Sequence, residues 1–346
     1  MTTGTGADAS DDPDENTDTV TDTTGTDEGL TYSEAGVDIE QSEAATAALI
    51  EAVGKTAGDY AGLLDIGDRY LALATDGVGT KLLVAEALSE FSTIGIDCIA
   101  MNVNDLVAAG VRPAAFVDYL AVESPDDVMA AAIGEGLATG AERAGIELVG
   151  GETAVLPEVI TGFDLAGACV GLAAKDAIFE GTAEIGDALV GWRSSGIHSN
   201  GLTLARTVAT LDGGSYTDPC PFEGYETIGD ALLEPTRIYT HLLDPLREAD
   251  VRAAAHVTGG GWGNLERLGD CRYAIESPFE PQPIFEFIQD RGDVSDAEMH
   301  RTFNMGTGFV AAVGADRADR LAEETDGRVI GRVESGEGVA VRGMVL

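Results

Sequence analysis

The stretch Thr75-Asp76-Gly77-Val78-Gly79-Thr80-Lys81 separates an apolar run at residues 70–74 from the sequence Leu-Leu-Val-Ala-Glu-Ala-Leu at residues 82–88. The apolar run predicts a short buried strand and the following sequence predicts a helix, so the stretch is expected to join them. Glycines let a backbone approach a ligand, a carboxylate holds a hard cation, and a lysine meets a phosphate oxygen. The stretch therefore fits a site for a phosphate and its divalent cation. A tight turn that caps the helix is the alternative, and a Walker A loop is excluded because leucine follows the lysine.

A second group of polar residues lies on a helix predicted at residues 97–109 and ended by Gly110. Asp97 and Asn104 are seven residues apart, which places them within about 20° of each other on a helix, and Asp105 lies next to them. We predict that these three side chains share one face as cation or phosphate ligands. In the alternative interpretation, Asp97 caps the helix and the Asn104-Asp105 pair is solvated.

The first half of the chain continues with predicted strands at residues 115–121, 146–149 and 163–173, and with a long helix at residues 125–144. Gly150-Gly151-Glu152-Thr153 follows the second of these strands, so Glu152 is expected just past a strand end, like Asp76. The resulting β-α-β-β-α-β order predicts an α+β fold with a mixed sheet rather than a doubly wound one.

Two loops in the second half each combine a histidine with glycines. Ser194-Ser195-Gly196-Ile197-His198-Ser199-Asn200-Gly201 precedes a helix predicted from about residue 202, and His256-Val257-Thr258-Gly259-Gly260-Gly261 precedes one around residues 263–268. Small donors at a helix N-terminus suit an anion, and a histidine can carry a proton. A structural role is the more common one for a single histidine in such a loop. Between the loops, Pro235 is predicted to lie in the first turn of a further helix.

Length and composition predict three parts: a disordered acidic tail at residues 1–30, an N-terminal domain at residues 31–175 and a C-terminal α/β domain at residues 176–346. The tail contains nine acidic residues and no basic one, with almost nothing to bury. The remaining chain is long enough for two domains with cores of their own.

The charge of the chain restricts its partners. Acidic residues outnumber basic ones by 61 to 20, which argues against a nucleic acid or an anionic membrane as partner. Without the nine acidic residues of the tail, 52 of the 61 remain against 20 basic ones, so the body carries a net charge of −32. Such acidity with only three lysines suggests adaptation to high salt, which screens self-repulsion.

The sequence predicts a cytoplasmic protein. Its cysteines are widely spaced, it contains no apolar run of about 18 residues, and it shows no basic and apolar signal region.

Seven motifs occur in the order and approximate spacing of one known family. They are TDGVGTK (75–81), GIDCIAMNVNDL (95–106), LVGGET (148–153), SSGIHSNG (194–201), LEPTRIY (233–239), HVTGGG (256–261) and RTFNMGTG (301–308). From residue 32 to near its C-terminus, the chain closely resembles the phosphoribosylformylglycinamidine cyclo-ligases. The acidic motifs also occur in ATP-using relatives such as selenophosphate synthetase and thiamine-monophosphate kinase, whereas the motifs of the second half point to the cyclo-ligases.

The resemblance implies a reaction and an assembly. The family uses ATP to close the ring of formylglycinamidine ribonucleotide, giving 5-aminoimidazole ribonucleotide, ADP and phosphate in purine biosynthesis. It implies ATP and Mg²⁺ as cofactors, with K⁺ as a second candidate cation. It also implies a homodimer in which the N-terminal domains form a β-barrel and the C-terminal domain closes on the site.

The resemblance also implies roles for the residues singled out above. The metal-shell candidates are Asp76, Asp97, Asp105 and Glu152. The candidates for catalysis are Lys81, which would meet the polyphosphate, and His198 and His256, which would bind a phosphate or carry a proton. The nucleotide-binding candidates are Lys55, Thr75, Gly77, Gly79, Thr80, Asn104, Gly150 and Gly151.

One segment departs from the family pattern, because the loop at residues 55–64 is shorter and poorer in glycine than the usual nucleotide loop. This difference puts the contacts to adenine in doubt. The competing interpretations are another ATP-dependent kinase or synthetase of the superfamily and a non-enzymatic, cation-binding scaffold. Selenophosphate synthetase is disfavoured, because it normally needs a reactive cysteine near its N-terminus and no cysteine precedes Cys98.

Overall fold

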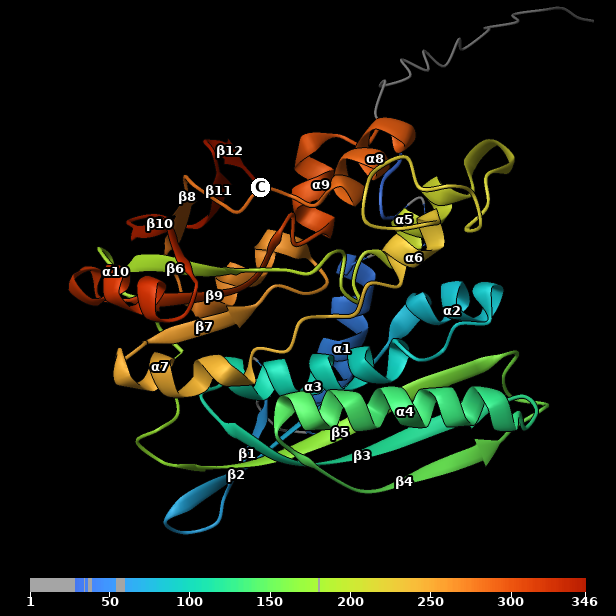
Figure 1. Ribbon diagram of the computed structural model, residues 1–346. Coiled ribbons are helices and arrows are strands. Elements are labelled where there is room, and N and C mark those ends of the chain that lie inside the picture. The colour runs from blue at the N-terminus through green and yellow to red at the C-terminus, as the bar shows by residue number, and fades with distance from the viewer. Residues whose placement is uncertain (1–28, 34, 37–38, 54–59, 180) are drawn as a thin grey trace, which may run out of the picture.

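The computed structural model describes residues 29–346, except residues 34, 37–38, 54–59 and 180. The predicted tail and the candidate Lys55 therefore lie outside the described residues. Figure 1 shows two parts, each built from one sheet and its helices, that pack against each other. The predicted α+β fold in two parts is confirmed.

The N-terminal sheet has five strands in the order β1-β2-β5-β3-β4. Its strands are β1 (Gly62–Asp65), β2 (Arg69–Gly77), β3 (Arg112–Val122), β4 (Glu147–Val155) and β5 (Phe163–Ala174). Only β3 and β4 run parallel, which makes the sheet mixed. Its helices are α1 (Ile39–Val53), α2 (Leu82–Leu88), α3 (Ile94–Ala108) and α4 (Asp127–Ala144), and a 3-10 turn at Gly79–Lys81 precedes α2.

Helices α3 and α4 cover one face of this sheet (Figure 1). They approach each other closely because glycines line the contact. A Cβ atom at Gly95 or at Gly136 would clash with the main chain of the opposite helix or of the segment before it. Gly145, in the left-handed conformation with φ of 70°, ends α4 as predicted from the sequence.

The C-terminal sheet has seven strands in the order β12-β11-β8-β10-β6-β9-β7. Its strands are β6 (Ala188–Arg193), β7 (Ala253–His256), β8 (Arg272–Ile275), β9 (Thr307–Val313), β10 (Arg328–Glu334), β11 (Gly338–Val341) and β12 (Met344–Val345). Its α-helices are α5 (Leu202–Ala209), α6 (Ile228–Leu232), α7 (Leu243–Glu248), α8 (Pro283–Gly292), α9 (Asp296–Thr302) and α10 (Ala315–Glu324). Three 3-10 segments lie at Leu211–Gly213, Thr240–Leu242 and Gly261–Leu268.

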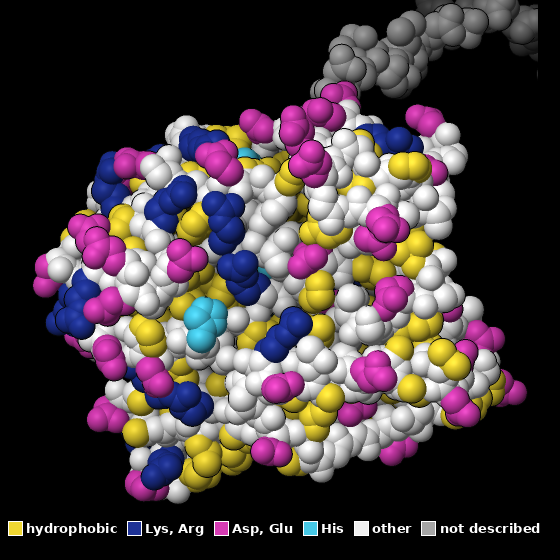
Figure 2. Space-filling view, viewed as in Figure 1, with side chains coloured by type: hydrophobic (Ala, Val, Ile, Leu, Met, Phe, Trp, Pro, Cys, Tyr) yellow, Lys and Arg dark blue, Asp and Glu magenta, His cyan; other side chains and the backbone are white. Residues whose placement is uncertain are grey.

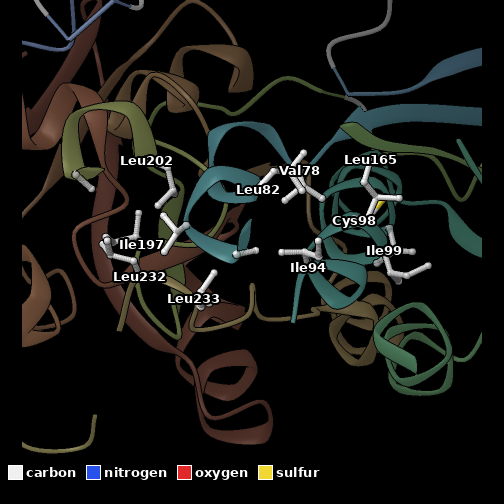
Figure 3. Packing of buried hydrophobic residues seen from close by; sticks show 14 of the residues in the cluster. Val78, Leu82, Ile94, Cys98, Ile99, Leu165, Ile197, Leu202, Leu232 and Leu233 are labelled. Carbon is white, nitrogen blue, oxygen red and sulfur yellow. The ribbon is translucent and has the colours of Figure 1, made fainter. Parts of the chain in front are cut away.

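One hydrophobic core runs through both parts of the molecule. Val78, Leu82, Ile94, Cys98, Ile99 and Leu165 of the N-terminal part belong to the same buried cluster as Ile197, Leu202, Leu232 and Leu233 of the C-terminal part (Figure 3). The predicted site loops, at residues 75–81 and 194–201, border this shared core. The two halves of the site are therefore fixed by apolar packing rather than by surface contacts.

The structure corrects three predictions about the elements. The Gly-Gly-Glu-Thr sequence at residues 150–153 lies inside β4, because β3 continues beside it as a pairing partner. Residues 235–239 form no helix, because side chains of α3 take up their main-chain groups. The elements of the first half follow the order β1-β2-α2-α3-β3-α4-β4-β5, not the predicted order, and β1 lies in a segment expected to be a loop.

Among the described residues, no helix is both long and apolar enough to cross a membrane.

Candidate active site

Asp76 and Asp105 come together where the two parts of the molecule meet. Asp76 lies near the end of β2, and its Oδ1 accepts a hydrogen bond from the N–H of Gly77 at 2.7 Å. Burial, and then the neighbouring charge of Asp105, raise the pKa of Asp76 to about 6, against the opposing influence of the Gly77 hydrogen bond and of His256. The two carboxylates therefore lie close enough to repel each other, and a cation between them would relieve that repulsion.

His256, at the end of β7, completes this group. Its Nδ1 lies 3.0 Å from Oδ1 of Asp105, and its Nε2 lies 3.3 Å from Nδ2 of Asn104. Since the amide Nδ2 can only donate, Nε2 accepts and Nδ1 carries the proton that Asp105 receives in a hydrogen bond. The carboxylate thus fixes the tautomer and the orientation of the buried imidazole.

Lys81 and Asp97 form a fully buried ion pair. Lys81 Nζ lies 2.7 Å from Oδ2 of Asp97 and donates to the main-chain oxygen of Glu234, also at 2.7 Å. Oδ1 of Asp97 accepts hydrogen bonds from the N–H and the hydroxyl of Thr236, at 2.8 and 2.6 Å. Both side chains are 0% exposed. These contacts turn the lysine and the aspartate towards the C-terminal part rather than towards Asp76.

Asn104 and Asp97 lie on one face of α3, as predicted, since both side chains bind the segment at residues 234–239. Their predicted role as ligands stays a prediction. Oδ1 of Asn104 accepts from the N–H of Tyr239 at 2.9 Å, and Nδ2 donates to the main-chain oxygen of Arg237 at 2.9 Å. Asp105, one position further along the helix, turns to His256 instead.

His198 is buried in an unusual backbone conformation. Its φ of 66° lies in the left-handed region, which residues other than glycine adopt rarely. Burial lowers the pKa of His198 well below its usual value, and the nearby His256, Lys81 and Arg237 lower it further. Its Nε2 accepts from the N–H of Ser195 at 3.1 Å, so the proton lies on Nδ1. That Nδ1 has no hydrogen-bond partner within the described residues.

The stretch at residues 75–81, which runs from the end of β2 into the 3-10 turn at Gly79–Lys81, packs against the start of α5. Thr80 Oγ1 lies 3.1 Å from Oγ1 of Thr203, and Thr75 Oγ1 donates to the main-chain oxygen of Gly167 at 2.8 Å. Gly79 has a φ of 72°, which explains why glycine is needed at this turn. The stretch therefore places Gly77 and Gly79 beside Asp76, with the second site loop on its other side.

Glu152 does not join the other carboxylates. It pairs with Tyr119 of β3, whereas Asp118 pairs with both Gly151 of β4 and Gly167 of β5. Gly167 in turn pairs with Asp76. Since directly paired residues share a face of a sheet and neighbours along a strand alternate, Glu152 lies on the face opposite to Asp76. The predicted convergence of Glu152 with Asp76 is not found.

Asp118 is a carboxylate that sequence reasoning missed. It shares the helix-covered face with Asp76, two strands and thus about 10 Å away. A Cβ atom at Gly151 would clash with its carboxylate, so that glycine makes room for Asp118, and Gly150 lies beside it in the same strand. Burial raises the pKa of Asp118. The only signal in the sequence was its position two residues from both Phe116 and Leu120, because alternation along a strand puts all three on the buried face.

Some cavities lined by described residues lie away from these side chains. One of about 360 Å³ is lined by Asp176, Phe179, Arg247 and Arg252, and another of about 270 Å³ by Tyr60, Ala108 and Ala254, among others. Neither contains the carboxylates or histidines described above. The candidate site is therefore defined by the carboxylates and histidines that come together, and not by a cavity.

Comparisons with known proteins identify the family of this chain. Residues 58–173 match the family model "AIR synthase related protein, N-terminal domain", and residues 184–343 match "AIR synthase related protein, C-terminal domain". A phosphoribosylformylglycinamidine cyclo-ligase of Methanosarcina acetivorans is 48% identical over 328 residues, which cover 92% of this chain and 98% of the relative. The chain belongs to the phosphoribosylformylglycinamidine cyclo-ligase family. The cyclo-ligase of Methanothermobacter thermautotrophicus is also 48% identical, over 84% of this chain and 89% of its own.

Solved structures show the same fold. A crystal structure of a Thermus thermophilus protein has a TM-score of 0.63 at 25% identity and covers 88% of this chain and 97% of that one. Thiamine monophosphate kinase from Aquifex aeolicus has a TM-score of 0.64 at 18% identity, over 90% of this chain and 99% of that one. At that identity the second likeness concerns the fold alone.

The residues present fit a divalent cation that the nucleotide helps to hold. Among the described residues, no group of three or more His, Cys, Asp and Glu side chains is placed to hold a metal unaided. Mg²⁺ in nucleotide sites is commonly held by one or two carboxylates and by phosphate oxygens. The half-buried Asp76 beside Asp105 matches that donor set.

Proposed function

We propose that the chain catalyses the ATP-dependent ring closure of formylglycinamidine ribonucleotide to 5-aminoimidazole ribonucleotide, with release of ADP and phosphate, in purine biosynthesis. The observation that carries the proposal is the 48% identity to a cyclo-ligase over 92% of the chain. The meeting of Asp76, Asp105 and His256 between the two parts supports it, because the reaction needs a cation site and a proton carrier together.

In this proposal, the formyl oxygen is first phosphorylated by ATP, which converts it into a good leaving group for attack by the amidine nitrogen. Asp76 and Asp105 would hold Mg²⁺, which supplies charge neutralisation on the polyphosphate when bound. The main-chain N–H groups around Gly77 and Gly79 would orient the phosphates, and Thr75 and Thr80 would border them. Such carboxylates repel ATP that carries no metal, so activity is expected to depend on Mg²⁺.

His256 is the better candidate of the two histidines for proton transfer. Asp105 holds its Nδ1–H, an arrangement that stabilises an imidazolium when Nε2 takes a proton. His198 has no such carboxylate, because its Nδ1 lacks a hydrogen-bond partner among the described residues, and its lowered pKa disfavours protonation. His198 would therefore act as a neutral donor through Nδ1. In the assay below, His256→Gln is expected to lower kcat more than His198→Gln does.

The decisive experiment follows product formation. Purified full-length chain, ATP, Mg²⁺ and formylglycinamidine ribonucleotide are combined in KCl-rich buffer, and 5-aminoimidazole ribonucleotide is measured. We expect product only when ATP and Mg²⁺ are both present. Absence of product from protein that circular dichroism shows to be folded would refute the proposed function.

The open face of the N-terminal sheet supports a homodimer. Leu73, Val117, Tyr119 and Leu172 lie on the face away from α3 and α4 and are 40–47% exposed. An apolar sheet face of this kind is typical of a surface that pairs with a second copy. The proposed assembly is a barrel formed by two such faces.

Tyr119→Asp is expected to convert the dimer into a monomer, because it buries an unpaired charge in the proposed interface. Light scattering coupled to gel filtration measures the mass of the wild type and of the variant. Val128→Asp, on α4 at a position 79% exposed, serves as the control and should leave the mass unchanged. A monomeric wild type at micromolar concentration contradicts the proposed dimer.

We also propose that the protein is adapted to a salt-rich cytoplasm. Its unfolding temperature is expected to rise between 0.1 and 1 M KCl, since the screening length falls from about 10 to about 3 Å over that range. A chain without residues 1–30 still carries −32 and should keep the same dependence. An unfolding temperature that is independent of KCl would contradict this adaptation.

A further inference from the structure

The segment at residues 234–239 is held by buried polar side chains of the N-terminal part. It joins α6 to the 3-10 turn at Thr240–Leu242 without regular structure of its own. Lys81 binds its start at Glu234, Asp97 binds Thr236, and Asn104 binds its end at Tyr239. All three of these side chains come from the N-terminal part and are fully buried.

Arg237 lies at the centre of this segment, between the two histidines. Its N–H points to Nε2 of His198 at 3.4 Å, and its main-chain oxygen accepts from Nδ2 of Asn104 at 2.9 Å. The same Asn104 nitrogen lies 3.3 Å from His256. Both main-chain polar groups of Arg237 are therefore used inside the protein, and its Cα position is fixed relative to the site.

The side chain of Arg237 is free to meet a ligand. Arg237 is exposed, and it forms no ion pair within the described part of the chain. By contrast, Arg317 and Arg320 each pair with a carboxylate. On the face shown in Figure 2, the Lys and Arg side chains gather over the half where Figure 1 places the C-terminal sheet.

We propose that Arg237 binds the 5′-phosphate of the ribonucleotide substrate, and that Lys81, Asp97 and Thr236 are positioning residues that hold Arg237 in place. This inference rests on the proposed function. The carboxylates Asp76 and Asp105 repel any phosphate without a metal, so a phosphate monoester needs a cation of its own on the histidine side of the site. A guanidinium offers two parallel N–H donors, which match two phosphate oxygens.

The first test separates the two substrates. Arg237→Ala is expected to raise the KM for formylglycinamidine ribonucleotide about 10- to 100-fold, since a hydrogen bond to a charged group is lost. The KM for ATP should stay within about twofold, and Arg237→Lys should recover part of the loss because it keeps the charge. Arg320→Ala, on α10, is the matched control. A rise in the KM for ATP instead, or no rise in either KM, overturns the proposal.

The second test measures binding without turnover. Ribose 5-phosphate should raise the unfolding temperature of the wild type and of Arg320→Ala but not that of Arg237→Ala, because only a folded phosphate site binds it. An equal shift in Arg237→Ala overturns the phosphate role. Because no reaction is involved, this readout remains valid even if the proposed ring closure fails in the product assay.

The positioning role has its own test. Thr236→Val removes the hydroxyl bond to Asp97, whereas Thr236→Ser keeps it. We expect Thr236→Val to raise the KM for the ribonucleotide about 5- to 10-fold with kcat little changed, and Thr236→Ser to behave as the wild type. Equal kinetics of Thr236→Val and the wild type would show that the segment does not position Arg237.

Discussion

Asp76→Asn is expected to lower kcat at least about 100-fold, a loss like that caused by removing one electrostatic contact to a transition state. The carboxylate is proposed to hold Mg²⁺ together with Asp105, and the amide that replaces it carries no charge. Since asparagine has the same size and shape as aspartate, the packing around residue 76 should not change. The loss of kcat would then come from the missing charge at the proposed Mg²⁺ site and not from misfolding.

The same substitution is expected to stabilise the protein in the absence of Mg²⁺. The pKa of Asp76 in the folded protein is about 6, above the ordinary 3.8, so the folded state binds this proton more tightly than the unfolded state does. The resulting stabilisation is full below pH 3.8 and is lost as the pH rises through 6. At pH 7 the charged carboxylate therefore costs about 3 kcal/mol, which Asp76→Asn removes.

Urea unfolding at fixed KCl, at pH 5 and pH 7, measures this effect alongside activity. The variant should exceed the wild type in unfolding free energy at pH 7, and the difference should shrink at pH 5. Asp68→Asn, whose side chain is 87% exposed in the β1–β2 turn, is the control and should change neither property. Full activity in Asp76→Asn, or a loss of stability at pH 7, contradicts the role given to Asp76.

Asp97→Asn is expected to lower the unfolding free energy by about 3–5 kcal/mol, because it leaves the ammonium of Lys81 buried without its counter-charge. The size of the effect follows from the complete burial of both side chains. An exposed pair would change stability by less than about 1 kcal/mol. Arg320–Glu324, on the surface of α10, is the comparison within the same chain, and Glu324→Gln should have that small effect.

The double variant Lys81→Met/Asp97→Asn gives the sharper result. Methionine removes the unpaired charge, while the asparagine oxygen still accepts from Thr236. Most of the stability lost in Asp97→Asn should return, giving a coupling energy of about 2–3 kcal/mol in a double-mutant cycle. Urea is the suitable denaturant because guanidinium would itself change the ionic strength. Additive losses in the double variant would show that the pair is not coupled.

Local sequence patterns were sufficient for the elements that bear the site. The strand-to-helix turn around Asp76 and the shared face of Asp97 and Asn104 follow from periodicity, which depends only on neighbours in the chain. The pairing of β3 with β4 does not follow from periodicity, because the two strands are far apart in the sequence. This pairing places Glu152 on the face opposite to Asp76. Partners far apart in sequence also kept residues 235–239 out of a helix, because α3 binds their main chain.

The sequence predicted which residues lie at the candidate site better than it predicted the role of each residue. Lys81 was expected at a phosphate and Asp97 at a metal, yet each has the other as its buried partner. The type of a charged residue in a motif does not show whether its side chain binds a ligand or another side chain. The burial of the side chain in the structure distinguishes these two roles. Asp118 was missed for the converse reason, because a single carboxylate inside an apolar strand has no motif around it.

The core shared by Val78, Ile94, Leu202 and Leu232 has a consequence for how such chains can diversify. Each half supplies apolar surface and hydrogen-bond partners that only the other half satisfies. The two halves are therefore not interchangeable modules, and a hybrid joined between residues 174 and 187 from two distant relatives would carry mismatched surfaces at its centre. We expect a change in the shared core of one half to require a compensating change in the other half, so the two halves should vary together in sequence.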